Sequence, residues 1–221
     1  MTDRLSRNGL LSMAACAARQ IREHHACLSA LDSVAGDGDH GSAMLRSAEK
    51  IERAVANAPE NCLRACFEQI AWGVFDADGG ASSSLLGSFF LGMRNGVPAN
   101  APSLDCRELA AAFQSGLRAM RKQTPAEVGD KTMMDALIPA VEAFSAAAAK
   151  GEDIAASLAE AACAARSGAE ATRHLTARYG RARWLGEKTR GHPDAGATSM
   201  ALLFEGFSEG LRSRKGETGH A

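Results

Sequence analysis

The sequence predicts an all-α protein, a single domain in which eight antiparallel helices form a bundle or barrel. Three observations favour this fold class. Alanine occurs 45 times, valine six times and isoleucine five, and alanine favours helices whereas β-branched residues favour strands. Apolar residues recur with a helical period along most of the chain. Segments rich in glycine and aspartate separate the periodic stretches: 32–42, 76–84, 123–131 and 186–198.

Hydrophobic periodicity and helix-ending residues place the individual helices. Pro59 and the glycine-rich segments end helices, and Ser103 is expected as the N-cap of the fifth. Pro139 is expected to bend the sixth. The expected helices cover approximately residues 10–31, 43–58, 63–74, 81–93, 105–120, 131–149, 153–178 and 197–211.

The order of the helices predicts where the polar segments lie. In an up-and-down bundle, alternate connections share one end. The four polar segments are all connections from an odd to an even helix, so we expect them to meet in one composite site. Residues 1–211 are expected to form the domain, and 212–221 a flexible tail.

Composition and charge exclude several classes of protein. The net charge is -1 and the pI is about 6.6, so neither nucleic acid nor an anionic membrane is an expected partner. The first ten residues lack the apolar core of a signal peptide, and no run approaches the roughly 18 apolar residues of a membrane span. The six cysteines are scattered and are expected to be buried, reduced thiols. We therefore expect a cytoplasmic protein.

The first polar segment, AGDGDHGSAM, contains the dinucleotide-binding pattern G-x-G-x-x-G at Gly36, Gly38 and Gly41. A Rossmann fold requires a strand before the first of these glycines. Here a helix precedes it, and the chain has few strand-forming residues. The pattern therefore does not indicate a Rossmann fold.

The same segment carries three carboxylates, those of Asp32, Asp37 and Asp39. Such hard oxygen ligands suit Mg²⁺ or Ca²⁺, but the calcium-binding EF-hand pattern is absent. Each carboxylate–phosphate contact at about 4 Å would cost roughly 4 kcal/mol at an effective dielectric near 20. Divalent cations between the two groups make the interaction attractive. The favoured interpretation is a magnesium–phosphate site, and the alternative is ordinary helix capping.

The other segments offer anion-binding groups, each with an ordinary structural alternative. Gly79 and Gly80 precede Ala81 and Ser82 at a helix N-terminus, where free N–H groups bind anions or are simply capped. Lys131 opposes a helix dipole unless it serves an anion or packs elsewhere. The fourth segment is a basic stretch that either contacts phosphate or is a solvated face, and its cations are Arg181, Arg183, Lys188 and Arg190.

Taken together, the four segments resemble a known family. LDSVAGDGDHG, GGAS, GDKTMMDALIPA and GRARWLGEKTRGHPDAGATS are similar, in order and spacing, to the nucleotide-binding L subunit of bacterial dihydroxyacetone (glycerone) kinases. The resemblance spans essentially the whole chain. It implies an eight-helix barrel that holds ADP or ATP and two Mg²⁺ ions at one end.

The resemblance also implies roles for individual residues. Asp32, Asp37 and Asp39 would be the metal ligands. The nucleotide-binding residues would be His40, Gly41, Ser42, Ala43, Ala81, Ser82, Met133, Arg181, Asp194, Ala195 and Gly196.

The sequence departs from the family pattern at several of these positions. Ala43 stands where asparagine is common, and Ser83 and Ser84 replace a Gly-Pro pair. Thr124 replaces a glycine near the nucleotide, so that contact is not carried over. Ala195 replaces proline in the last turn. These departures point to looser nucleotide retention or to a paralogue with another sugar substrate.

The function implied by the resemblance is phosphoryl transfer to a small keto-sugar. The acceptor would lie on a separate subunit, and the donor would be ATP or a phosphohistidine protein of a phosphotransferase system. No nucleophile–base pair is evident, so no catalytic residue is assigned; His40 is expected to contact the nucleotide rather than accept a phosphoryl group. The alternatives are a kinase subunit for another keto-sugar such as erythrulose, a nucleotide-sensing module that docks on a regulator, and a Mg²⁺-dependent hydrolase.

Overall fold

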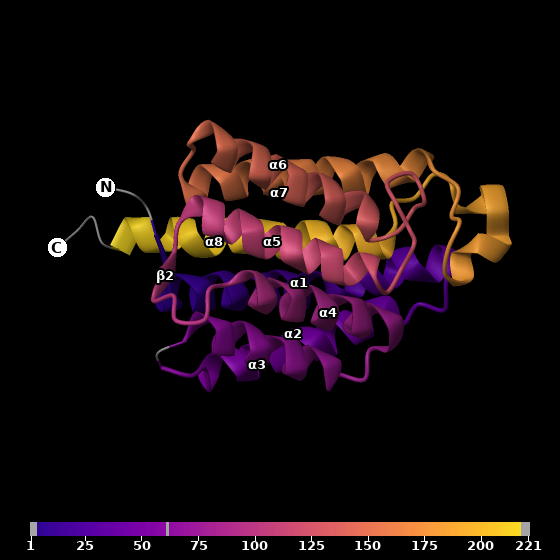
Figure 1. Ribbon diagram of the computed structural model, residues 1–221. Coiled ribbons are helices and arrows are strands. Elements are labelled where there is room, and N and C mark those ends of the chain that lie inside the picture. Colours follow the sequence, from indigo (N-terminus) through magenta and orange to yellow (C-terminus); the bar gives the residue numbers. More distant parts are fainter. Residues whose placement is uncertain (1–3, 61, 218–221) are drawn as a thin grey trace.

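The computed structural model describes residues 4–60 and 62–217 and confirms the all-α fold. Within these residues eight α-helices run along one long axis (Figure 1). Helices that are consecutive in the sequence pack against each other, and α8 packs against α1, which closes the barrel. The helices are α1 (Arg7–Ala35), α2 (His40–Ala56), α3 (Leu63–Phe75), α4 (Gly80–Gly96), α5 (Cys106–Arg121), α6 (Met134–Lys150), α7 (Ile154–Ala171) and α8 (Ala195–Glu217).

Aromatic rings fill the interior where α4, α5, α6 and α8 meet. The ring of Phe113 lies 4.9 Å from that of Phe144 and 5.5 Å from that of Phe204, between ring centroids. Phe89 and Phe207 complete the cluster. All five side chains are buried, and burial of each contributes on the order of 2 kcal/mol. This core fixes the helices whose ends carry the polar connections.

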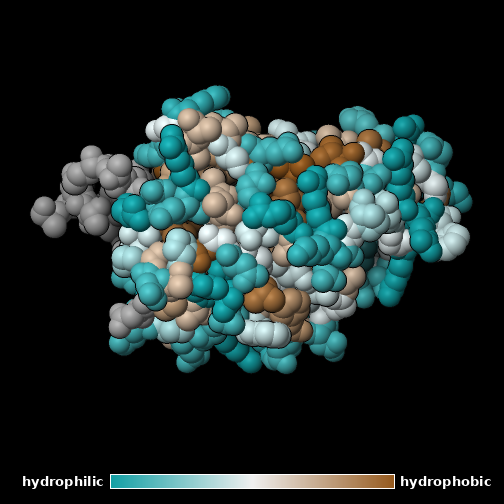
Figure 2. Space-filling view, in the orientation of Figure 1, coloured by the Kyte–Doolittle hydropathy of each residue, from teal (hydrophilic) through white to brown (hydrophobic). Residues whose placement is uncertain are grey.

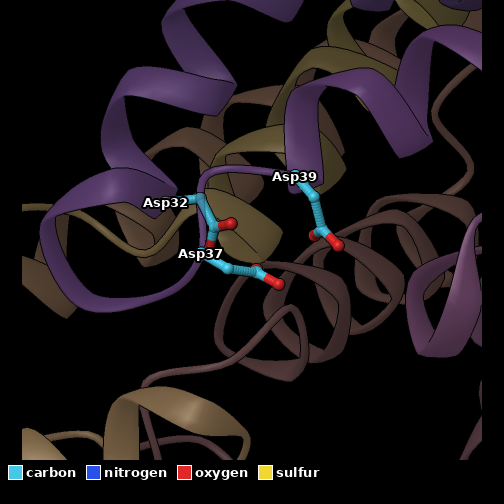
Figure 3. A group of neighbouring side chains, drawn as sticks. All are labelled: Asp32, Asp37 and Asp39. Atoms are coloured by element: carbon cyan, nitrogen blue, oxygen red, sulfur yellow. The ribbon is translucent and has the colours of Figure 1, made fainter.

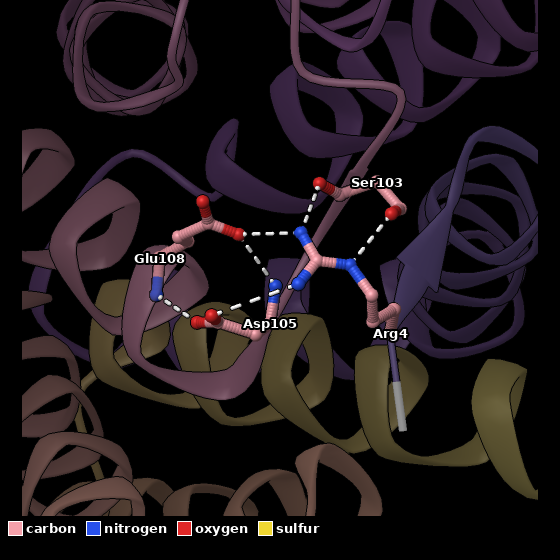
Figure 4. A network of polar contacts seen from close by, with 4 residues as sticks. All are labelled: Arg4, Ser103, Asp105 and Glu108. Atoms are coloured by element: carbon pink, nitrogen blue, oxygen red, sulfur yellow. Dashed lines mark hydrogen bonds and ion pairs between the residues drawn. The ribbon is translucent and has the colours of Figure 1, made fainter. Parts of the chain in front are cut away.

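Two short strands close the end of the barrel that carries the N-terminus. β1 (Leu5–Ser6) pairs antiparallel with β2 (Ser103–Leu104). The guanidinium of Arg4 donates to both Ser103 oxygens at 2.8 and 2.9 Å and to Glu108 Oε2 at 2.9 Å (Figure 4). The predicted N-cap was therefore wrong: Ser103 lies in β2, and Asp105 caps α5 in a capping box with Glu108.

The boundaries of the later helices also differ from the prediction. α6 begins at Met134 rather than near Lys131, because Lys131 has φ +60 and the Asp135 carboxylate accepts the Gly129 and Thr132 N–H groups. α7 ends at Ala171 rather than Arg178, because Thr172 forms hydrogen bonds to distant residues. Two 3₁₀ segments that the sequence did not predict follow α7: η1 (Thr172–His174) and η2 (Arg181–Thr189), and η2 is interrupted by a kink at Gly186, whose φ is +53.

Three smaller expectations have different outcomes. Pro139 lies inside α6, and the bend expected there stays a prediction. Helix α8 continues to Glu217, so it includes part of the expected tail 212–221, and residues 218–221 lie outside the described residues. No disulfide links the six cysteines, but only Cys66 is buried.

In the part of the chain that the structure describes, no helix combines the length and the apolar character needed to cross a bilayer. The face shown in Figure 2 is covered mainly by hydrophilic residues, with small apolar patches between the helices.

Candidate functional site

The four polar connections meet at the end of the barrel opposite the Arg4 contacts (Figure 1). They surround a cavity of about 620 Å³. All four connections contribute lining residues, so the prediction that the four polar segments meet at one end is confirmed. From the predicted set, the cavity is lined by Asp32, Asp37, Asp39, His40, Ala43, Ala81, Ser82, Met133, Arg181, Asp194, Ala195 and Gly196.

The three predicted metal ligands lie where α1 ends and α2 begins. Asp32 is in the last turn of α1, Asp37 is in the loop, and Asp39 is the N-cap residue of α2. One oxygen from each carboxylate lies within 4.8 Å of the other two, and Figure 3 shows the side chains on the end of α1, the connecting loop and the start of α2. At this separation two ionised carboxylates repel by about 3 kcal/mol at an effective dielectric near 20. The cluster is therefore suited to a cation.

The glycines of this segment have steric roles that explain the misleading pattern. A Cβ at Gly36 would lie 2.3 Å from Asp32 Oδ1, so any side chain there would displace that carboxylate. A Cβ at Gly41 would lie 2.0 Å from the carbonyl oxygen of His25 on α1. Glycine thus allows the carboxylate turn to form and α2 to approach α1.

His40 is held inside the cavity wall by two serines. Its Nδ1 lies 3.0 Å from Ser82 Oγ and its Nε2 lies 3.1 Å from Ser199 Oγ. Burial lowers the pKa of His40, although the charge of Asp32 opposes this shift. Since both ring nitrogens are engaged, the ring is poorly placed to accept a phosphoryl group.

Two of the predicted nucleotide-binding residues lie outside the cavity lining. Gly41 is buried against α1, and Ser42 is exposed. Both residues lie in the first turn of α2, so their role as nucleotide contacts stays a prediction. The sequence pattern did not distinguish backbone from side-chain contact at these positions.

The start of α4 presents free N–H groups to the cavity. Gly79 occupies the N-cap position and no side chain caps the helix. Gly79, Gly80, Ala81 and Ser82 all line the cavity. An uncapped helix N-terminus is an anion-binding feature, because its N–H groups lack intrahelical partners.

The serines that replace the family's Gly-Pro pair are accommodated in different ways. Ser83 is buried, and its hydroxyl lies 2.9 Å from Ser47 Oγ on α2. Ser84 lines the cavity. The departure therefore adds a buried hydrogen bond between α2 and α4 and one further polar lining residue.

The third connection places Met133 at the cavity, while its charged groups stabilise the loop. The Lys131 ammonium donates to the carbonyl oxygens of Thr172 and His192, both at 2.6 Å. Burial lowers the pKa of Lys131. These hydrogen bonds join the third connection to two other segments, and Lys131 also lines the cavity, so the anion-binding role expected for it stays a prediction.

The fourth connection places an acidic residue, Asp194, and a basic residue, Arg181, at the cavity. Asp194 Oδ2 accepts the Ala197 N–H at 2.7 Å and so caps α8. Burial raises the pKa of Asp194 to about 6. Arg181 forms an ion pair with Asp37, and of the four cations in the basic stretch it alone lines the described cavity.

Sequence reasoning missed several residues of the site. Tyr179, Arg46 and Asp78 line the cavity, and Ser199 holds His40. Arg46 lies seven residues after Asp39, on the same face of α2, and this spacing was a usable signal. Ser199 gave no signal, because its position beside His40 depends on the packing of α8 against α2.

Comparison with known proteins places this geometry in context. The model of the family described as the DAK2 domain matches residues 34–209. The ADP-binding subunit DhaL of a PEP-dependent dihydroxyacetone kinase from Listeria innocua is 34% identical over 185 residues, which are 84% of this chain and 87% of that protein. The L-erythrulose 1-kinase of Mycolicibacterium smegmatis is 37% identical over 195 residues, which are 86% of this chain but 33% of that protein.

A solved structure agrees with the fold. The dihydroxyacetone kinase from C. freundii, in complex with AMP-PNP and Mg²⁺, superposes with a TM-score of 0.70 and 28% identity. The match covers 94% of this chain and 35% of the larger chain. This chain thus corresponds to about a third of that kinase and of the erythrulose kinase, and to most of the Listeria subunit.

Proposed function

Because the chain belongs to the DAK2-domain family, we propose that it is the ADP-binding subunit of a dihydroxyacetone kinase. In this role it holds a magnesium nucleotide and transfers a phosphoryl group to a small keto-sugar on a partner subunit. One observation carries the proposal: three carboxylates within 4.8 Å of one another share a cavity with the uncapped N-terminus of α4. A polyanion accompanied by divalent cations satisfies both features.

The carboxylates of Asp32, Asp37 and Asp39 form the metal site in this proposal. Their hard oxygen atoms match the ligand preference of Mg²⁺, which usually completes its coordination with water and substrate phosphate. Two ions are proposed, because three carboxylates and a diphosphate carry more negative charge than one Mg²⁺ offsets. The cations supply the charge neutralisation that phosphoryl transfer needs.

Groups from the other connections bind the nucleotide. The N–H groups at Ala81 and Ser82 face phosphate, and Arg181 can neutralise either Asp37 or a phosphate oxygen from the cavity wall. Residues 40–43 add backbone groups at the start of α2. Met133 offers an apolar face to the base, and the turn of Asp194, Ala195 and Gly196 closes that side.

No residue is proposed as a general base. Both His40 nitrogens are bound, and burial of the ring lowers its pKa. Catalysis by this subunit is therefore positioning and charge stabilisation, as in other phosphoryl transfers. This favours a transferase over the alternative of a hydrolase, which must activate a water molecule.

The keto-sugar is proposed to lie on a separate subunit that docks around the cavity mouth. Exposed large apolar side chains gather at this end of the described chain: Val34, Val128, Tyr179, Trp184 and Leu185, with Trp72 near the end of α3. Trp184 is 78% exposed, and exposed large apolar side chains near a site are a feature of surfaces that bind a partner protein.

The identity of the sugar and of the phosphoryl donor has two candidates each. The Listeria relative is named as a PEP-dependent dihydroxyacetone kinase subunit, which favours dihydroxyacetone and a phosphohistidine donor protein. The similarity to an L-erythrulose 1-kinase favours erythrulose as the second candidate. A direct ATP donor, a docking role on a regulator and a cytoplasmic location remain expectations.

Calorimetry with ADP tests the proposal. Tight binding is expected only with Mg²⁺ present, because ADP alone meets the repulsion of three carboxylates. Asp37→Asn is expected to weaken Mg–ADP binding at least tenfold, about 1.4 kcal/mol. Asp76→Asn is the matched control, since Asp76 is exposed beyond the cavity lining and pairs with Lys50. Metal-independent tight binding, or an unaltered affinity in Asp37→Asn, would contradict the proposal.

Reconstitution of the complete reaction tests whether a partner subunit is required. The chain, a keto-sugar-binding subunit, ATP and either dihydroxyacetone or erythrulose should yield sugar phosphate only when all components are present. Release of phosphate by the chain alone would identify the hydrolase alternative. ADP that survives dialysis would favour the phosphoprotein donor, and ready exchange would favour ATP.

A further inference from the structure

A chain of hydrogen bonds runs from the interior of α8 to the cavity wall. Ser199 is fully buried, and its Oγ lies 2.8 Å from the Gly196 carbonyl oxygen and 3.1 Å from His40 Nε2. On the other side of the ring, Nδ1 lies 3.0 Å from Ser82 Oγ. Ser82 lines the cavity. A buried serine on one helix is thus connected, through the imidazole, to a hydroxyl at the ligand site.

The direction of each of these hydrogen bonds follows from which atoms can donate and which can accept. A hydroxyl has one hydrogen, and a carbonyl oxygen only accepts. The Ser199 hydroxyl donates to Gly196, so its oxygen accepts from Nε2, which therefore carries a hydrogen.

The other ring nitrogen must then be an acceptor. The ring is buried, and burial disfavours its charged form. A neutral imidazole has one N–H, and the hydrogen bond that Nε2 donates to Ser199 selects its position. With the hydrogen on Nε2, Nδ1 has the lone pair and accepts the Ser82 hydroxyl hydrogen. The Ser82 oxygen is left with lone pairs toward the cavity.

We propose that Ser199 is a positioning residue that fixes the Nε2–H tautomer of His40 and thereby turns the Ser82 hydroxyl hydrogen away from the ligand. Ser82 Oγ then accepts from a hydrogen-bond donor, such as a ribose hydroxyl or a metal-bound water, and does not donate to phosphate. Phosphate is left to the backbone N–H groups of α4. The identity of the ligand rests on the proposed function, whereas the tautomer is a property of the ligand-free protein.

NMR of the complete chain with ¹⁵N-labelled histidine tests the tautomer without ligand. Long-range ¹H–¹⁵N spectra distinguish protonated from unprotonated ring nitrogens, and His40→Gln identifies the His40 signals among those of the six histidines. A neutral ring with the hydrogen on Nε2 is expected. A ring with the hydrogen on Nδ1, or a charged ring, would overturn the inference even if no Ser199 variant folds.

Variants of α8 test the role of Ser199. In Ser199→Ala the ratio of Nε2–H to Nδ1–H is expected to fall by roughly fivefold or more, since a lost hydrogen bond costs about 1 kcal/mol. Ser199→Thr keeps the hydroxyl and should restore the ratio. Ser208→Ala is the control: Ser208 is buried on the same helix, and its hydroxyl has no hydrogen-bond partner among the described residues. An unchanged ratio in Ser199→Ala would overturn the inference.

Calorimetry of Ser82→Ala tests the consequence at the site. A hydroxyl that does not donate to phosphate predicts less than about a fivefold loss of Mg–ADP affinity, whereas loss of a hydrogen bond to a charged group costs more. A larger loss would overturn the proposed orientation. Absence of Mg–ADP binding to the unaltered chain would count against the proposed function alone, because the tautomer is measured without nucleotide.

Discussion

The two ends of the barrel both gather charged side chains, but they differ in how those charges are neutralised. At the closed end, Arg4 contacts Glu108 and Asp105, and the serine oxygens beside them complete the network (Figure 4). At the cavity end, three carboxylates lie within 4.8 Å of one another, and Arg181 pairs with one of them (Figure 3). In the first arrangement Arg4 pairs with both carboxylates, whereas in the second three carboxylates share one ion pair, so negative charge is in excess.

Side-chain caps on helix N-termini are found at both ends of the barrel. At the closed end, Ser6, Asp105 and Asp153 cap α1, α5 and α7, although α3 has no side-chain cap. At the cavity end, Asp194 caps α8, Asp32 Oδ2 accepts the His40 N–H at the start of α2, and Thr132 Oγ1 accepts the Met134 N–H at the start of α6. Within the described residues, α4 has no side-chain cap. Capping stabilises a helix and also fills its anion site. Within the described residues, α4 thus lacks the stability that a side-chain cap would add, and its N-terminus stays open to the cavity.

The largest expected effect comes from filling the open N-terminus of α4. Ala81→Asp places a carboxylate in its first turn, which is favourable to the helix dipole but repels phosphate by roughly 4 kcal/mol at about 4 Å. We expect Mg–ADP affinity to fall at least a hundredfold, about 2.7 kcal/mol, with thermal stability unchanged or raised. Ala155→Asp makes the same change in the first turn of α7 and should leave affinity unaltered. If the two variants bound Mg–ADP with similar affinity, the proposed difference between the N-termini of α4 and α7 would be contradicted.

A pH dependence of stability is the next largest effect. The folded-state pKa of Asp194 is raised to about 6 from a usual value near 3.8. The folded protein therefore binds more protons than the unfolded chain between pH 4 and 6, so this group makes stability fall as pH rises through that window. The change is at most about 3 kcal/mol. Denaturant titrations with a chelator present should show the slope reduced in Asp194→Asn, and an identical slope would contradict the shift.

Removing a cap at the closed end is expected to have a smaller effect. Asp105→Ala deletes the acceptor for the Glu108 N–H, which lies 2.8 Å from Asp105 Oδ1. A loss of about 1 kcal/mol in the free energy of unfolding is expected. Mg–ADP affinity, measured by calorimetry, should stay constant. A change in affinity would show that the two ends are coupled.

The smallest expected effect is a gain in stability at the cavity end. Asp39→Asn removes one charge from the carboxylate cluster, and the exposed position of Asp39 limits the relief. We expect ligand-free stability to rise by about 0.5 kcal/mol in low salt and less in high salt, while Mg–ADP affinity falls. Destabilisation of the ligand-free protein would show that Asp39 serves as an ordinary turn residue.

Much of the fold was predictable because its determinants are local. Alanine content and helical periodicity predicted eight helices, and the alternation of connections predicted that four polar segments share one end. The three aspartates were identifiable because they lie within eight residues of one another. These predictions depend on neighbours in sequence, and the structure confirms the helices and the shared cavity.

The remaining features depend on contacts between distant residues. The end of α7 is set by Thr172, whose hydroxyl accepts the Asp194 N–H and whose carbonyl accepts from Lys131. The 3₁₀ segment η2 was likewise not predicted, because the sequence there showed only a run of basic residues. Gly41 and Ser42 matched the family motif, yet the structure places them outside the cavity lining.

The sequence by itself determined the helices, the end at which the polar segments meet and the presence of an acidic turn. Only the tertiary structure decided which side chains face the cavity, which helix N-termini stay open and which serine holds His40. The physical reason is range: helical periodicity is encoded within a few turns, whereas the hydrogen bond between Ser199 and His40 joins residues 159 positions apart.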